Sequence, residues 1–159
     1  MTEEDRIERL VCEYGRMLVR LAASRLDSVA DAEDAVQDVF CTLVSKKLVF
    51  VDPEYEKAWL IRATINRASD LRRSRLNVPL DEARAVPDDA AETERRGREM
   101  LACVRALPEK YAVVLHLHYY EGCGLREIGV MLRVPAATVG TRLARGRARL
   151  KALLEEESL

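Results

Sequence analysis

Residues 125–154, LREIGVMLRVPAATVGTRLARGRARLKALL, predict a short helix, a tight turn and a longer helix. Apolar residues recur at helical spacing in the first helix, namely Leu125, Ile128, Met131 and Leu132. Gly124 can serve as the N-cap of this helix, and Pro135 suits the first position of the next one. The second helix carries a continuous apolar seam, formed by Val139, Leu143, Gly146, Leu150 and Leu153. This pattern predicts a helix-turn-helix.

The opposite face of the second helix is basic. No acid lies between Glu127 and Glu155, whereas this interval contains Arg133, Arg142, Arg145, Arg147, Arg149 and Lys151. The helix begins with small uncharged residues that let its backbone approach base edges, namely Ala136, Ala137, Thr138, Gly140 and Thr141. A helix-turn-helix with a basic second helix is suited to the major groove, so the pattern predicts DNA binding.

Two other interpretations of this basic face stay open. It could be the solvated face of an ordinary bundle, or a helix that lies on a membrane surface. Gly140 and Gly146 each cost about 1 kcal/mol relative to Ala inside a helix. We therefore expect a close approach at these two positions, either to DNA or to a neighbouring helix.

Composition limits the remaining possibilities. The 159 residues are 48% hydrophobic with a net charge of −1, so the excess of positive charge is local to residues 92–159. The first residues, MTEEDRIERL, are no signal peptide, and no apolar run reaches the roughly 18 residues of a membrane span. We expect a cytoplasmic protein without membrane insertion. No metal or cofactor is expected, because His116 and His118 would point to different faces of a helix. The four cysteines, Cys12, Cys41, Cys103 and Cys123, favour buried free thiols.

The rest of the chain also shows helical periodicity. Helices are predicted over residues 3–26, from an N-cap at Asp31 to about Ser45, and over residues 54–76. The run Leu48–Val51 has no second strand to pair with, so it predicts a loop tucked onto the bundle and anchored by Phe50. The stretch NVPLDEARAVPDDAA at residues 77–91 has two prolines and predicts a linker. Helices return over residues 92–106 and from Pro108 to Glu121. The fold class is therefore all-α, with two small helical domains joined by a flexible linker.

Two polar faces stand out in the first domain. The second helix has an acidic outer side, with Glu33, Asp34, Gln37 and Asp38, which is either solvated surface or a docking face for a basic partner. The third helix has a polar side that includes Arg62, Asn66, Arg67, Asp70 and Arg73. Asn66 has poor helix propensity in mid-helix and good base-pairing chemistry.

Three segments carry a resemblance to a known family. DAEDAVQDVF at residues 31–40, AWLIRATINRASDLRR at residues 58–73 and the stretch from Leu107 to Leu150 resemble the extracytoplasmic-function (group 4) sigma factors, members of the sigma-70 family of bacterial RNA polymerase. The segments occur in the family's order, with a linker where the family has one. The resemblance covers nearly the whole chain.

The resemblance implies a division into parts. Residues 1–77 would form the sigma-2 domain, 78–91 the linker and 92–159 the sigma-4 domain. Sigma-2 would dock on the β′ clamp helices of core polymerase through Glu33, Asp34, Gln37 and Asp38. It would melt and read the −10 element of promoter DNA through Lys46, Lys47, Arg62, Asn66, Arg67, Asp70 and Arg73. Sigma-4 would bind the β flap and read the −35 element through Arg133, Ala136, Ala137, Thr138, Gly140, Thr141, Arg142, Arg145 and Arg149. An anti-sigma factor would be a further partner.

Two other functions remain alternatives. One is a sigma-like regulator that binds a protein partner without promoter recognition, and the other is a helix-turn-helix one-component transcriptional regulator. An enzyme is not expected, because the sequence shows no nucleophile triad, metal-ligand set or phosphate-binding loop.

Overall fold

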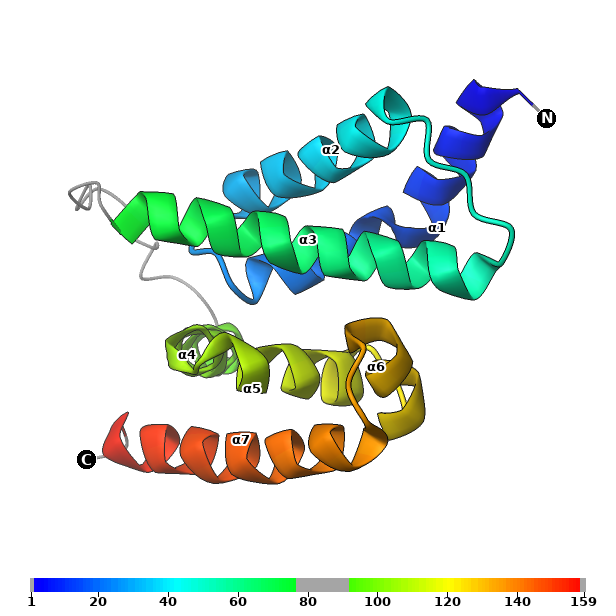
Figure 1. The fold of residues 1–159 in the computed structure, drawn as a ribbon. Coiled ribbons are helices and arrows are strands. Elements are labelled where there is room, and N and C mark those ends of the chain that lie inside the picture. The colour runs from blue at the N-terminus through cyan, green and yellow to red at the C-terminus, as the bar shows by residue number, and fades with distance from the viewer. Residues whose placement is uncertain (1, 77–91, 158–159) are drawn as a thin grey trace.

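The computed structural model describes residues 2–76 and 92–157, and within these ranges every regular element is a helix (Figure 1). The all-α prediction is confirmed. The predicted linker over residues 78–91 lies outside the described residues. The first half contains α1 (Glu3–Ala23), α2 (Val29–Ser45) and α3 (Pro53–Leu76). The second half contains α4 (Glu92–Ala106), α5 (Glu109–Leu115), the π-helix η1 (His116–Tyr120), α6 (Leu125–Leu132) and α7 (Ala136–Glu157).

The N-termini of α1 and α2 are set by side-chain caps. Thr2 and Asp5 form a capping box, in which the Thr2 hydroxyl accepts the Asp5 N–H at 3.2 Å and Asp5 accepts the Thr2 N–H at 3.3 Å. The predicted N-cap at Asp31 was wrong. Ser28 caps α2 instead, because its backbone is extended and its hydroxyl accepts the Asp31 N–H. Asp31 lies in the first turn, where its carboxylate favours the positive helix end.

The first three helices pack on one apolar core. The α1, α2 and α3 helices contact one another pairwise. Their largest fully buried side chains are Leu10, Leu18, Leu21, Leu43, Leu60 and Ile61. Fully burying each such side chain contributes about 1.5–3 kcal/mol. The loop before α3 is anchored as predicted by Phe50, whose ring lies 5.9 Å from that of Trp59, while Val49 and Val51 on either side are exposed.

In the second half, α7 packs on α4, α5 and α6. A Cβ at Gly146 would lie 3.2 Å from both Leu115 Cδ1 and Tyr111 Cβ, so this glycine lets α5 approach α7 closely. That contact decides the open question about Gly146 in favour of a neighbouring helix. The prediction for Pro135 was wrong by one residue. Pro135 precedes α7, and its carbonyl accepts the Val139 N–H at 3.2 Å.

The helix before the helix-turn-helix ends differently from its prediction. The sequence predicts one regular helix to Glu121, but residues His116–Tyr120 form a π turn, in which the Glu121 N–H donates to the His116 carbonyl. Gly122 follows with φ 74°, the left-handed conformation predicted for the residue after a helix. Gly124 then caps α6, as predicted.

Two of the four cysteines differ from prediction. Cys103 and Cys123 are buried free thiols, and burial raises the pKa of Cys123. Cys12 and Cys41 are exposed, because they lie outside the apolar stripes of α1 and α2. Across residues 2–76 and 92–157, no group of His, Cys, Asp and Glu side chains could hold a metal ion.

The two halves of the chain are packed against each other, with α3 in contact with α6 (Figure 1). The C-termini of α1 and α4 meet at this contact, and each leaves carbonyl groups without helical partners. Arginines from the opposite half satisfy several of them. Arg105 donates to the Ala23 carbonyl at 3.0 Å, Arg72 to the Arg105 carbonyl at 2.6 Å, and Arg25 to the Val104 carbonyl at 3.4 Å. Burial lowers the pKa of Arg25 to about 10.

A bidentate ion pair adds to this contact. Arg20 on α1 donates to both carboxylate oxygens of Glu121 at 2.9 Å, and the Glu121 side chain is only 8% exposed. Burial alone would raise the pKa of Glu121, but its bonds to Arg20 and its proximity to His116 lower the pKa overall. Bidentate charge-assisted hydrogen bonds are among the strongest polar contacts in proteins.

Reversing the charge of Arg20 is expected to loosen the contact between the two halves. Arg20→Glu would remove two charge-assisted bonds and place two carboxylates together, which costs about 2 kcal/mol or more. We expect a larger radius of gyration in small-angle X-ray scattering. The swap Arg20→Glu with Glu121→Arg should restore the compact value, and Arg16→Glu, an exposed position on the same helix, should not change it. An unchanged radius for Arg20→Glu would show that the ion pair does not hold the halves together.

Candidate nucleic-acid interface

The first turns of α7 carry most of the residues predicted to contact duplex DNA. Of the nine, Arg133, Ala137, Thr141, Arg145 and Arg149 are exposed, and Ala136, Thr138, Gly140 and Arg142 are half-buried. The Thr141 hydroxyl donates to the Ala137 carbonyl at 3.1 Å, which holds this side chain against the helix. Arg133 lies in the turn itself, with φ 60°, as the left-handed residue that ends α6. The structure thus brings eight of the nine together on one helix and places Arg133 in the turn before it.

Gly140 is not required by internal packing. A Cβ at this position would meet only Leu125 Cδ2, at the ordinary contact distance of 3.4 Å. The neighbouring helix therefore explains Gly146 but not Gly140. A close approach from outside the chain remains the physical reason for a helix-weakening glycine at position 140.

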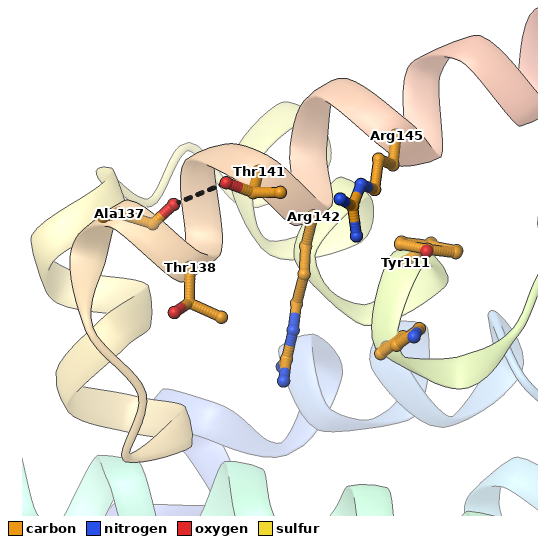
Figure 2. A pocket seen from close by; sticks show the side chains of 7 residues that line it. Tyr111, Ala137, Thr138, Thr141, Arg142 and Arg145 are labelled. Atoms are coloured by element: carbon orange, nitrogen blue, oxygen red, sulfur yellow. Dashed lines mark hydrogen bonds between the residues drawn. The ribbon is translucent and has the colours of Figure 1, made fainter.

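A cavity of about 290 Å³ lies between α5 and α7 (Figure 2). Figure 2 shows Thr138 and Arg142 projecting from α7, with the Arg145 guanidinium above the Tyr111 side chain of α5. The cavity is polar and open on one side. Its lining residues are Lys110, Tyr111, Ala137, Thr138, Thr141, Arg142 and Arg145.

The sequence analysis missed Lys110 and Tyr111. Both lie on α5, far from α7 in sequence, and helical periodicity does not reveal which faces of two separate helices meet. The available signal was Gly146, which predicted a close neighbour for α7 without naming it. Tyr111 is 4% exposed, with the Lys110 ammonium 5.1 Å and the Arg149 guanidinium 4.9 Å from its ring centroid.

The residues predicted to act on the −10 element fall into separate groups. The ion pair of Arg67 with Asp38, at 2.8 Å, sets the register of the antiparallel helices α2 and α3. Lys46 and Lys47 lie at the C-terminus of α2, eight and nine residues beyond Asp38, whereas Arg73 lies six residues beyond Arg67 in the opposite direction. Lys46 and Arg73 are therefore about 20 Å apart at 1.5 Å per residue. Asn66 and Asp70 are exposed on α3, and Asp70 pairs with Arg73.

Arg62 is engaged at the contact between the two halves. Its guanidinium donates to the Met131 carbonyl near the end of α6 at 2.9 Å. Burial and the nearby Arg133 both lower the pKa of Arg62. In this conformation, α6 therefore covers the Arg62 part of the α3 face, while Asn66 stays open to solvent.

The predicted docking face on α2 is exposed except at one position. Glu33, Asp34 and Gln37 are exposed, whereas Asp38 is half-buried and paired with Arg67. Asp38 and Arg67 were assigned to different partners, and the structure joins them to each other. The free acidic surface of α2 thus centres on Asp34.

Among the helices that the structure describes, none is both long and apolar enough to span a membrane.

Comparisons with known proteins agree with this two-part organisation. The family described as Sigma-70 region 2 matches residues 10–77, and the family described as Sigma-70, region 4 matches residues 97–150. The chain is 31% identical to the ECF RNA polymerase sigma factor SigM of Mycobacterium tuberculosis, over 92% of this chain and 76% of that protein. It is 28% identical to the RNA polymerase sigma factor SigZ of Bacillus subtilis, over 94% of this chain and 87% of that protein.

A solved structure shares the fold. It is the sigma factor RpoE of Bartonella quintana in complex with the anti-sigma factor NepR, with a TM-score of 0.70 and 19% identity. The similarity covers 93% of this chain and 96% of that chain.

Proposed function

This chain belongs to the extracytoplasmic-function sigma factors of the sigma-70 family, which direct promoter-specific transcription initiation by RNA polymerase, and from that premise we propose how its surfaces divide the work. The chain binds core polymerase and reads two promoter elements in the cytoplasm. Its role is regulatory, and the catalysis belongs to the polymerase. Residues 1–77 act as sigma-2, residues 92–159 as sigma-4, and residues 78–91 join them.

We assign the −35 element to the outer face of α7. The observation that carries this assignment is the combination of exposed small residues in its first turns with arginines along the same helix. Arg145 and Arg149 are suited to phosphates, which position the helix without reading sequence. Thr138 and Thr141 are suited to base edges. Arg142 could also reach a guanine, where a bidentate contact gives about 1–3 kcal/mol of discrimination.

We assign the −10 element to the exposed side of α3 and the loop before it. Extruding a base from the DNA stack costs a few kcal/mol and needs a surface that receives it. Asn66 offers the amide, and the exposed Val49, Val51 and Tyr55 offer apolar surface beside Lys46 and Lys47. Arg62 can join this site only after its bond to the Met131 carbonyl is broken.

The protein partners follow from the same assignment. The acidic surface around Asp34 would dock on the β′ clamp helices of core polymerase, and sigma-4 would bind the β flap. An anti-sigma factor is a further partner, supported by the structural neighbour that was solved with one. The two alternative functions lack this support. A one-component regulator would not need the match to region 2, and a sigma-like adaptor would not need the α7 face.

In vitro transcription tests the proposal directly. Core polymerase alone should start at few defined sites, and adding the purified chain should direct initiation to a discrete set of promoters, mapped by sequencing of the RNA 5′ ends. Thr138→Ala with Thr141→Ala should change which −35 sequences are used. Binding to core polymerase without any redirected initiation would instead support the sigma-like adaptor.

A further inference from the structure

The cavity between α5 and α7 gathers positive charge from two helices that are distant in sequence. Lys110 comes from α5, and Arg142 and Arg145 come from α7. The other residues of the lining are neutral, so three cations converge without an acid among the residues that line the cavity. Like charges held close together repel one another, and an anion between them relieves that repulsion.

Tyr111 holds this arrangement in place. Its ring is buried, and its hydroxyl shares a hydrogen bond with the Arg145 side chain. Lys110 and Arg149 lie over the ring at cation–π distance. Burial by itself raises the pKa of Tyr111, yet these cations lower it overall, which reflects the positive potential around the cavity. Cations fixed before binding lose less conformational freedom when a ligand arrives.

The position of the cavity limits what the anion can be. Thr138 and Thr141, from the first turns of α7, form part of its wall (Figure 2). An anion in the cavity would therefore lie at the edge of the helix that we assign to the −35 element. The chemical group that repeats along the edge of a DNA groove is the backbone phosphate.

We propose that Lys110, together with Arg142 and Arg145, binds one backbone phosphate of duplex DNA beside the −35 element. This inference rests on the proposed function of α7 and adds a residue from α5 to its DNA contact. The phosphate is held between two helices. It therefore fixes the angle at which α7 enters the groove, and it does so without reading sequence.

The test measures binding of the full-length chain to a labelled duplex that carries the promoter mapped by transcription. Lys110→Ala should reduce the slope of log K against log salt by about 0.9 and weaken binding roughly ten-fold at about 0.1 M salt. Lys110→Arg should keep most of the affinity. The loss should be the same for duplexes with altered −35 bases, because a phosphate contact carries no sequence information.

A matched lysine separates a built site from general charge. Lys151 is also exposed in the second half of the chain but does not line the cavity. Lys151→Ala should leave the slope nearly unchanged. An equal loss for Lys151→Ala and Lys110→Ala, or an unchanged slope for Lys110→Ala, would overturn the proposal.

Chemical modification of the DNA identifies the phosphate and excludes a free-phosphate site. Neutral methylphosphonates are placed one at a time along both strands of the −35 region. One position should weaken the wild-type chain roughly ten-fold and Lys110→Ala less than about two-fold, since the same contact cannot be lost twice. If Lys110→Ala silences no position, the cavity does not hold a DNA phosphate. That result would leave the proposed function intact if the wild-type chain still redirects initiation.

Discussion

Gly129→Ala is expected to destabilise the helix-turn-helix and to remove most promoter-dependent transcription. A Cβ on Gly129 would lie 2.7 Å from the Val134 carbonyl oxygen and 3.4 Å from the Ala136 nitrogen. Both atoms belong to the backbone of the turn, so no side chain can move aside. The Gly129 carbonyl also accepts the N–H groups of Arg133 and Val134, which closes the turn. Overpacking of this kind costs typically about 1–3 kcal/mol, more than the roughly 1 kcal/mol that Ala gains over Gly in a helix.

The measurement is chemical unfolding, together with transcription at the mapped promoters. Gly97→Ala is the matched control, because Gly97 is exposed in α4 and a Cβ there would meet nothing within 4 Å. The control should be neutral or stabilising by up to about 1 kcal/mol. An unchanged unfolding free energy for Gly129→Ala would mean that the turn can relax without cost.

Asp34→Arg is expected to abolish most of the binding to core polymerase. Asp34 is exposed at the centre of the acidic surface of α2, where the proposed partner is basic. Placing like charges across an interface costs several kcal/mol, and about 3 kcal/mol corresponds to a loss of more than 100-fold in affinity. Asp34 is a sharper target than Asp38. Replacing Asp38 would also break its ion pair with Arg67 and so disturb the packing of α2 on α3.

The affinity of a labelled chain for core polymerase, measured by fluorescence anisotropy, checks this prediction. Glu8→Arg makes the same change of charge at an exposed position of α1 and should bind normally. Equal weakening by both variants would indicate a response to net charge. Normal binding of Asp34→Arg would remove the docking role of α2.

The helices were predictable because their signals are local. Leu10, Leu18 and Leu21 recur on one face of α1, and Val139 and Leu143 do so on α7, so periodicity alone identified the helices and much of the core. The N-cap of α2 was misplaced because Ser28 and Asp31 are both good capping residues three positions apart. Only the backbone conformation at Ser28 decides between them.

Contacts between distant segments were not predictable. Periodicity indicates that a helix has a partner but not which one, so Lys110 was missed at the cavity and Arg20 was missed as the partner of Glu121. Nothing in the local sequence of Asp38 or Arg67 shows that each neutralises the other. The individual DNA-contacting and polymerase-contacting roles stay predictions, since they depend on surfaces outside this chain.

The contact of α3 with α6 has a consequence for the reach of the protein. Positions −35 and −10 of a promoter are separated by roughly 85 Å of duplex at 3.4 Å per base pair, whereas α3, the longest helix described, extends only about 36 Å. In the folded-back arrangement seen here, the two reading surfaces are too near each other to span that interval. Promoter engagement therefore requires the halves to part, so the strength of the Arg20–Glu121 and Arg62–Met131 bonds sets a threshold that polymerase must overcome. A molecule that keeps this threshold would leave promoters untouched until polymerase has opened it.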